Sequence, residues 1–308
     1  MISIVVPMYN EARMVRELHR RIVMAMAKTT HAYEIIFVND GSTDETEKET
    51  EGLCPVKVIS LQRNYGETPA LDVGIQEAKG DILVLLDADL QHDPADIPRL
   101  LSELSEDVDV IIGWRQVRHD HWTRVVFSYF ANSVSRAVLG VDVHDFGSGL
   151  KIYRSKFIKD FRLWGDAQVF LPAVAKEKGA RIKEIPIQHY VRQAGMSKIR
   201  IANMIKGGFD LLSIAFFVKY FQKPLRFFGG WGVAFVGFSL LVFVSSVVLR
   251  FMHVANLSET PLPVIGTMFM ILGILLFMMG LLAEVLLRVY YVMIHRSPYM
   301  VRHIRENK

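Results

Sequence analysis

Cysteine is nearly absent from this chain, whose 308 residues include a single one, Cys54. One thiol excludes an intramolecular disulfide and any zinc site built from several cysteines. Net charge is also small, because 36 Lys and Arg residues stand against 32 Asp and Glu residues. This balance gives no reason to expect a nucleic-acid partner. No G-x-G-x-x-G pattern follows the first apolar run, which disfavours a dinucleotide-binding oxidoreductase.

The N-terminus lacks the features of a secretion signal. Residues 1–7 contain no basic stretch and no long apolar stretch, so we interpret them as a first strand and expect the body of the protein in the cytosol. Internal repeats and low-complexity segments are absent too. Hydrophobic residues nevertheless make up 51% of the chain, with the excess in its last third. A soluble body joined to a membrane part is therefore the first expectation.

Apolar runs alternate with helical patterns over the first two thirds of the chain. Strands are predicted at 2–6, 33–38, 56–60, 82–86, 108–112 and 152–153, with an edge strand within 181–190. Helices are predicted between them, the first over about 11–28. This alternation is typical of an α/β protein with right-handed crossovers and a mostly parallel sheet. Ligands of such sheets gather outside the carboxyl ends of the strands.

Two carboxylates follow the fourth of these apolar runs, in Asp87-Ala88-Asp89-Leu90-Gln91-His92. If the chain stays extended there, Asp87 and Asp89 share one face, and Gln91 can add a neutral oxygen to a site for a hard cation. The alternative is that Asp89 only caps a helix and Asp87 is a solvated strand end. Because Asp40 ends a second strand of the same predicted sheet, the acids converge on one edge, which favours the site.

Other candidates each have two interpretations. Asp40 can accept hydrogen bonds from a base or a ribose, or it can form a plain Asx turn. Arg115, Arg124 and Ser128 can form a phosphate clamp or a solvated basic face. Asp145, in a loop rich in glycine, is a candidate general base or an ordinary loop residue.

The last third of the chain suggests membrane segments. Residues 199–226 are apolar but punctuated by charges, which predicts amphipathic interfacial helices, or a buried docking helix. Two apolar runs at about 229–250 and 264–288 are long enough to cross a bilayer. Lys and Arg flank the pair of runs and are sparse between them, so the spans should form a hairpin with both termini in the cytosol.

Five stretches, taken in order, resemble the polyprenyl-phosphate branch of glycosyltransferase family 2. They are residues 5–12, 38–44, 87–92, 148–151 and 192–198. This branch includes enzymes similar to dolichol-phosphate mannose synthase and to bactoprenol glucosyltransferases. The resemblance covers nearly the whole chain. It implies a GT-A type, Rossmann-like sheet with helices on both faces, followed by interfacial helices and a transmembrane hairpin.

The resemblance also implies an activity: inverting transfer of one sugar from a nucleoside diphosphate sugar to polyprenyl phosphate, undecaprenyl or dolichyl. Catalytic roles would fall to Asp87, Asp89 and Arg115, and Mg²⁺ or Mn²⁺ would be held by Asp89 and Gln91. The residues implied for the nucleotide sugar are Pro7, Tyr9, Glu11, Asp40, Asp87, Asp89 and Lys198. Those implied for the lipid phosphate are Arg115, Arg124, Ser128 and Arg192.

The predicted domains follow from these assignments. They are a cytosolic catalytic domain (1–198), interfacial helices (199–226), two transmembrane helices (227–291) and a cytosolic basic tail (292–308). The lipid bilayer is an expected partner, and a homo-oligomer is left open. Two other functions also stay open: a transferase of the same fold with another lipid acceptor, and a non-catalytic membrane scaffold that binds nucleotide sugars.

The chain departs from the family pattern in three places. Asn39 stands where many members have Asp. Gln168-Val169 stands where many relatives have a His-Arg pair, so sugar preference can differ if it is read there. The chain has no Gln-x-x-Arg-Trp motif, which argues against the processive polysaccharide synthases of the superfamily.

Overall fold

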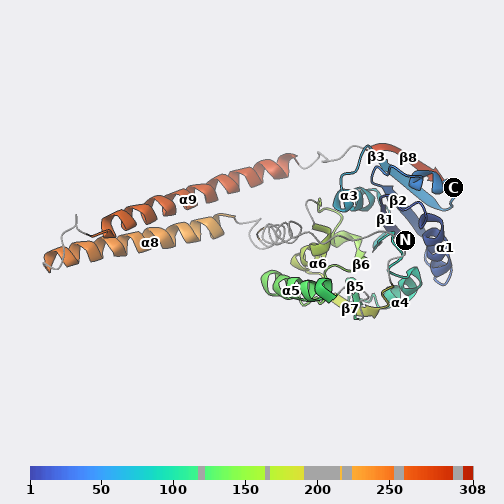
Figure 1. The fold of residues 1–308 in the computed structure, drawn as a ribbon, viewed down its shortest axis with the longest axis horizontal. Helices are drawn as coiled ribbons and strands as arrows, with labels where there is room; N and C mark the ends of the chain where they lie inside the picture. The colour runs from blue at the N-terminus through green and yellow to red at the C-terminus, as the bar shows by residue number, and fades with distance from the viewer. Residues whose placement is uncertain are drawn as a thin grey trace. The chain divides into compact units, whose positions relative to one another are not determined.

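The computed structural model of the protein describes residues 1–116, 122–163, 167–190, 216, 224–252, 260–293 and 301–307. The chain divides into two compact units. One comprises Met1–Ile214 together with Ser297–Lys308, and the other comprises Ala215–Arg296. The first unit is a sheet with helices, and the second contains two long helices (Figure 1).

An eight-stranded sheet forms the first unit, in the order β7-β5-β6-β4-β1-β2-β3-β8 (Figure 1). The strands are β1 Ile2–Met8, β2 Tyr33–Asn39, β3 Val56–Leu61, β4 Ile82–Leu86, β5 Val110–Arg115, β6 Leu150–Arg154, β7 Ile182–Ile187 and β8 Val301–Asn307. β1 to β4 pair in parallel, and so do β5 and β7. Only β6 and β8 run antiparallel to their neighbours among the described strands. The predicted α/β class with a mostly parallel sheet is confirmed.

The sheet is most apolar at its centre. Every residue of β1 is buried, and its neighbours β2 and β4 are apolar runs that are buried over most of their length. Such runs are typical of parallel strands that are covered on both faces. Because β1, β2 and β4 pair in parallel, their carboxyl ends emerge at the same edge of the sheet. The loops that follow these strands therefore meet there.

Helices connect the strands of this unit. They are α1 Val15–Met26, α2 Thr46–Glu49, α3 Glu67–Glu77, α4 Ile97–Ser102, α5 Trp122–Leu139 and α6 Ala167–Glu177, with 3₁₀ turns at Pro94–Asp96 and Ser155–Phe157. The first helix begins later than predicted. Asn10 has a left-handed φ of 56°, and the Glu11 N–H donates to Thr46 Oγ1 at 2.8 Å, so this segment forms a loop that is tied to α2.

The strand β8 was not predicted, because residues 292–308 were interpreted as a basic tail. In the structure β8 lies antiparallel to β3, with Ile304 opposite Ile59. Its side chains hold it in place: Arg305 Nη2 donates to Thr50 Oγ1 at 2.7 Å, and His303 Nε2 lies 2.8 Å from Glu47 Oε1. A charged strand at the edge of a sheet also discourages further edge-to-edge pairing.

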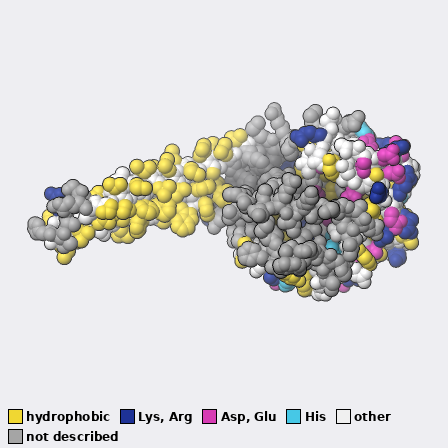
Figure 2. All heavy atoms as spheres, in the orientation of Figure 1, with side chains coloured by type: hydrophobic (Ala, Val, Ile, Leu, Met, Phe, Trp, Pro, Cys, Tyr) yellow, Lys and Arg dark blue, Asp and Glu magenta, His cyan; other side chains and the backbone are white. Residues whose placement is uncertain are grey.

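The second unit contains a pair of packed helices, α8 Pro224–Phe251 and α9 Leu262–Met293. Both are long and apolar enough to cross a membrane. Figure 2 shows apolar side chains covering them, whereas Lys, Arg, Asp and Glu gather on the first unit. Small residues let the helices approach closely: Ser239 Oγ donates to the Gly266 carbonyl at 2.6 Å, and Gly232 lies against Gly273. Most of residues 199–226, predicted as interfacial helices, lie outside the described residues.

Candidate active site

A cavity of about 480 Å³ lies at the carboxyl edge of the sheet. Its walls come from the ends of β1, β4 and β5, from the loops after β2 and β3, and from the starts of β6 and α6. The predicted site residues that line it are Pro7, Tyr9, Glu11, Asp40, Asp87, Asp89, Gln91 and Arg115. Parallel pairing thus gathers these residues from distant parts of the chain.

Asp87 and Asp89 lie in a turn directly after β4, and the extended segment predicted for them is wrong. Leu90 has a left-handed φ of 55°, and the Gln91 N–H donates to Asp89 Oδ1 at 3.1 Å. Ligand atoms of Asp87, Asp89 and His92 lie within 4.8 Å of one another. The two carboxylates therefore meet because the chain folds back on itself.

This donor set fits a hard divalent cation. Carboxylate and amide oxygens are preferred ligands of Mg²⁺ and Mn²⁺. Gln91 lines the same cavity, and its Nε2 faces the Tyr190 carbonyl at 3.5 Å, so its amide oxygen is not the atom used in that contact. His92 is 2% exposed, and its Nε2 accepts a hydrogen bond from the Gly149 N–H at 3.4 Å. Burial, together with the nearby Arg115 charge, lowers the pKa of His92 to about 3, which keeps the ring neutral and able to accept.

Asp40 holds protein backbone. Its two carboxylate oxygens accept hydrogen bonds from the Tyr65 and Gly66 N–H groups, each at 2.8 Å. Burial raises the pKa of Asp40, and these two bonds oppose that shift. The turn after Asp40 is instead held by the neighbouring side chain, since Asn39 Oδ1 accepts a hydrogen bond from the Ser42 N–H at 3.0 Å. Asp40 therefore ties the loop after β3 to the cavity, and its contact with a nucleotide stays a prediction.

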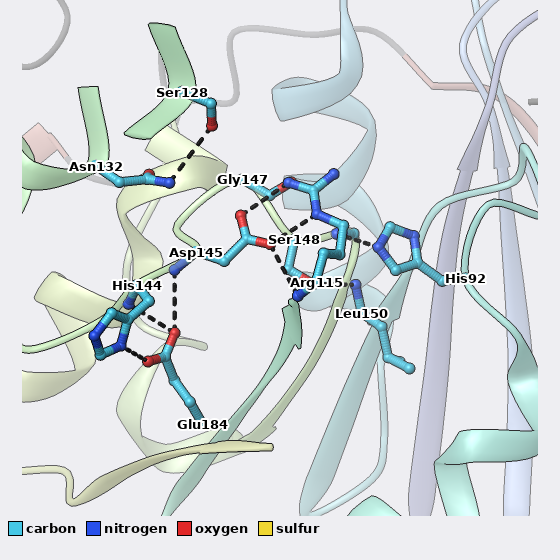
Figure 3. Close-up of polar contacts among 11 residues, drawn as sticks. His92, Arg115, Ser128, Asn132, His144, Asp145, Gly147, Ser148, Leu150 and Glu184 are labelled. Carbon is cyan, nitrogen blue, oxygen red and sulfur yellow. Dashed lines mark hydrogen bonds and ion pairs between the residues drawn. The ribbon is translucent and has the colours of Figure 1, made fainter. Parts of the chain in front are cut away.

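Arg115 ends β5 and forms a bidentate ion pair with Asp145 (Figure 3). Its Nε donates to Asp145 Oδ2 at 2.7 Å and its Nη2 to Asp145 Oδ1 at 2.8 Å. Nη2 also donates to the Gly147 carbonyl at 2.7 Å. The Asp145 side chain is fully buried. Because both of its oxygens accept from a guanidinium, Asp145 is a counter-ion here, which disfavours the alternative of a general base.

The remaining predicted residues are not brought into the cavity by the described structure. Ser128, on α5, is not among the described residues that line it, and its Oγ faces Asn132 Nδ2 at 3.5 Å (Figure 3). Arg124 lies on the same helix, but its side chain lies outside what the structure describes, as do Arg192 and Lys198 entirely. Tyr190, the last described residue before Arg192, is bound to the acidic turn: its N–H donates to the Gln91 carbonyl at 2.9 Å.

The residues that line the cavity but were not predicted as site residues include Lys151, Gln168 and Glu67. Lys151 is 5% exposed, and its Nζ donates to the Gln168 carbonyl at 3.2 Å. Burial lowers its pKa to about 8, against the raising effect of the Asp87, Asp145 and Glu67 charges. A lysine within the apolar strand β6 was the signal that could have identified it. Gln168 and Val169, noted as a departure from the family, both line this cavity.

Known proteins resemble this chain over its whole length. The family model described as Glycosyl transferase family 2 matches residues 3–162. A dodecaprenyl-phosphate galacturonate synthase of Rhizobium johnstonii is 35% identical over 317 residues, covering 100% of this chain and 94% of its own. An undecaprenyl-phosphate 4-deoxy-4-formamido-L-arabinose transferase of Edwardsiella ictaluri is 31% identical, covering 98% of this chain and 94% of its own.

Solved structures share the fold of most of this chain. Glucosyl-3-phosphoglycerate synthase from Mycobacterium tuberculosis, in complex with Mg²⁺ and uridine diphosphate, superposes with a TM-score of 0.57 at 16% identity. The superposition covers 71% of this chain and 79% of that one. A complex of the same enzyme with Mn²⁺, uridine-diphosphate-glucose and glycerol 3-phosphate gives a TM-score of 0.54 at 16% identity, with the same coverage.

Proposed function

This chain belongs to glycosyl transferase family 2, and we propose that it transfers one sugar, with inversion, from a nucleoside diphosphate sugar to polyprenyl phosphate. One observation carries the proposal: a single cavity gathers the carboxylates of Asp87 and Asp89 with the cations Arg115 and Lys151. That arrangement suits a bound metal and a phosphate-rich substrate. The full-length relatives, named for dodecaprenyl and undecaprenyl phosphate, support the choice of acceptor.

The reaction forms one bond and breaks one. A phosphate oxygen of the acceptor attacks the anomeric carbon, and the bond from that carbon to the β-phosphate oxygen breaks, its electron pair leaving with the nucleoside diphosphate. A phosphate monoester has a second pKa near ~6, so at neutral pH the acceptor is already an anion and needs no general base. This fits the ion pair that occupies Asp145.

Negative charge builds on the leaving diphosphate, and the cavity residues can stabilise it. Mg²⁺ or Mn²⁺ held by Asp89 and Gln91, with Asp87 beside it facing the donor, would supply a positive charge at this place. Arg115 and Lys151 place two further cations in the same cavity. Fixed charges aimed at developing charge are the larger part of such catalysis, since they need no reorganisation during the reaction.

The two helices α8 and α9 support the proposal of an integral membrane protein. The Lys and Arg residues that flank them favour a cytosolic catalytic unit. The apolar surfaces of both helices are largely exposed in the structure, as expected for helices in contact with lipid. Polyprenyl phosphate resides in the membrane, so an anchored enzyme meets its acceptor there. Arg192, Arg124, Ser128 and Lys198 remain the residues we propose for gripping phosphates near the membrane surface.

A donor panel tests this function directly. Membranes that contain the protein are incubated with polyprenyl phosphate and labelled UDP- or GDP-sugars, with and without EDTA. We expect label in the lipid fraction from at least one donor, and loss of that label with EDTA. No labelled lipid from any donor would refute the activity, and transfer that EDTA does not reduce would remove the metal.

A matched pair of variants tests the acidic turn. Asp89→Asn should lose metal-dependent transfer while the protein still inserts in membranes, because the change removes a charged ligand. Asp107→Asn makes the same chemical change at an acid whose side chain is 91% exposed and pairs with Arg181, and it should keep wild-type transfer. Equal activity of Asp89→Asn and wild type would rule out the ligand role.

A further inference from the structure

The loop of residues 144–149, between α5 and β6, contacts both halves of the proposed site. We propose that Glu184, on the edge strand β7, is a positioning residue for the transfer reaction: it anchors this loop, and the loop sets the positions of Arg115 and Asp87. The proposal rests on the proposed function and adds to it a residue that touches neither substrate nor metal. It is argued from three sets of contacts.

Glu184 holds the start of the loop. Its Oε1 accepts hydrogen bonds from the N–H groups of His144, at 2.8 Å, and Asp145, at 3.1 Å (Figure 3). Its Oε2 lies 2.7 Å from His144 Nδ1, and the side chain is only 10% exposed. On its other side the His144 ring stacks on Trp114 of β5, with centroids 4.8 Å apart. Two consecutive backbone donors thus depend on one carboxylate oxygen.

The middle of the loop holds Arg115. Asp145, whose backbone N–H is bound by Glu184, grips the guanidinium through both carboxylate oxygens. The Gly147 carbonyl accepts a third bond from it at 2.7 Å (Figure 3). An arginine on a free stem must lose much side-chain entropy to meet a phosphate. Here three hydrogen bonds fix the guanidinium before any substrate arrives, which is the condition for preorganised electrostatic stabilisation.

The end of the loop holds Asp87. The Gly149 carbonyl accepts a hydrogen bond from the Asp87 N–H at 3.1 Å. Gly149 also lies directly against the Asp87 carboxylate, since a Cβ at this position would overlap Asp87 Oδ2. The Gly149 N–H points to His92 Nε2 at 3.4 Å. Any shift of the loop therefore moves the guanidinium and the acidic turn together.

The variants Glu184→Ala and Glu184→Gln test whether the hydrogen-bond acceptor of the Glu184 side chain, and not its charge, holds the loop. Glutamine keeps an oxygen that can accept from both N–H groups, whereas alanine leaves them without an acceptor. The matched control is Glu103→Ala, which removes an acid that pairs with Lys183 of the same strand and whose side chain is 42% exposed. All variants are made in the full chain and reconstituted in lipid nanodiscs.

Two measurements decide the proposal. In steady-state transfer with the donor that wild type uses, Glu184→Ala should lower kcat about 10–100-fold and raise KM for polyprenyl phosphate, because Arg115 is no longer held. Glu184→Gln should restore most of the loss, and Glu103→Ala should match wild type. Hydrogen exchange followed by mass spectrometry should show faster exchange of peptides covering residues 144–149 in Glu184→Ala only.

Two results would overturn the proposal: unchanged exchange of residues 144–149 in Glu184→Ala, or equal loss of transfer in the alanine and glutamine variants. Failure of the proposed function would look different. In that case wild type itself labels no lipid with any donor, while the exchange measurement still reports whether Glu184 anchors the loop.

Discussion

Gly149 lies directly against the acidic turn at Asp87. Its backbone does not need a left-handed φ, so the requirement for glycine comes from space alone: a Cβ would overlap Asp87 Oδ2. We therefore expect Gly149→Ala to displace the Asp87 carboxylate. Displacement of a reacting group by about 1 Å can cost about a hundredfold in rate, and kcat for sugar transfer measures it.

The control for Gly149→Ala is Gly237→Ala. It makes the same chemical change on α8, where a Cβ meets nothing within 4 Å. This variant should transfer sugar at the wild-type rate. If Gly149→Ala is as active as Gly237→Ala, the close approach of Gly149 and Asp87 has no part in the reaction.

Deprotonation of Lys151 should make the rate of sugar transfer fall at alkaline pH. Its pKa is lowered to about 8 by burial, so the ammonium that faces the cavity is lost above this pH. The ordinary pKa of a lysine is 10.5, so between about 8 and 10.5 the unfolded chain binds more protons than the folded one. The stability that depends on Lys151 consequently rises with pH in this window, and a fall in activity there is not due to unfolding by this group.

The measurement for Lys151 is kcat/KM for the donor between pH 6 and 10, with melting temperatures in parallel. Wild type should decline above pH about 8. Lys151→Arg keeps its charge to higher pH, so its decline should move up, while Lys151→Met should be weak at every pH. A basic limb that is identical in Lys151→Arg and wild type would assign it to another group.

Sequence alone predicted which acids lie together at the edge of the sheet, but not which residues contact them. Asp40 and Asp87 each end an apolar run, and parallel pairing places such ends together. Their partners come from far along the chain: the Tyr65 N–H for Asp40, and Gly149 for Asp87. The same holds for Arg115 with Asp145. Nothing local marks these contacts, because each depends on how separate loops pack.

Among the elements, the parallel core was predictable and the antiparallel additions were not. Strands of continuous Val, Ile and Leu predict a parallel sheet that is covered on both faces. β6, with the sequence LKIYR, is shorter and carries two charged residues, and its antiparallel direction follows from the long connection through α5. β8 has the sequence VRHIREN, which reads as a tail. Its pairing depends on side-chain contacts to the α2 region that only the folded unit provides.

The hairpin of α8 and α9 provides a prediction about packing. Gly232 and Gly273 face each other so closely that a Cβ on Gly273 would lie 2.7 Å from the Gly232 carbonyl oxygen. Gly266, Gly273 and Gly280 recur on α9 at heptad spacing, which keeps the small residues on one seam. Gly273→Leu should force the helices apart and destabilise the protein by about 1–3 kcal/mol. Thermal unfolding of the full chain in detergent would measure this loss.

The control for the seam is Gly237→Leu on α8. A Cβ there meets nothing within 4 Å, so this position faces away from the other helix. The added apolar side chain should leave the melting temperature close to that of wild type. Equal melting temperatures for Gly273→Leu and Gly237→Leu would show that the close contact does not contribute to stability.

At the scale of the whole molecule, the chain leaves the sheet after β7, forms α8 and α9, and returns to the sheet as β8. Both connections of the helical unit therefore lead to one folded body. All strands of one hydrogen-bonded sheet must lie on the same side of a bilayer, because backbone groups left unpaired in the hydrocarbon core are costly. If α8 and α9 each cross the membrane, they must cross it in opposite directions.

Both termini should consequently lie on the same side of the membrane as the catalytic unit. The Lys and Arg residues that flank the two spans predict that this side is the cytosol. We expect a protease site added after Lys308 to be cleaved in inverted vesicles and protected in sealed, right-side-out cells or vesicles. A site inserted at 253–259, between the spans, should show the opposite pattern.

Cleavage of both sites from the same side would contradict the hairpin, because then at most one helix crosses. Cleavage of the terminal site only from outside would instead reverse the orientation and separate the catalytic unit from a cytosolic donor.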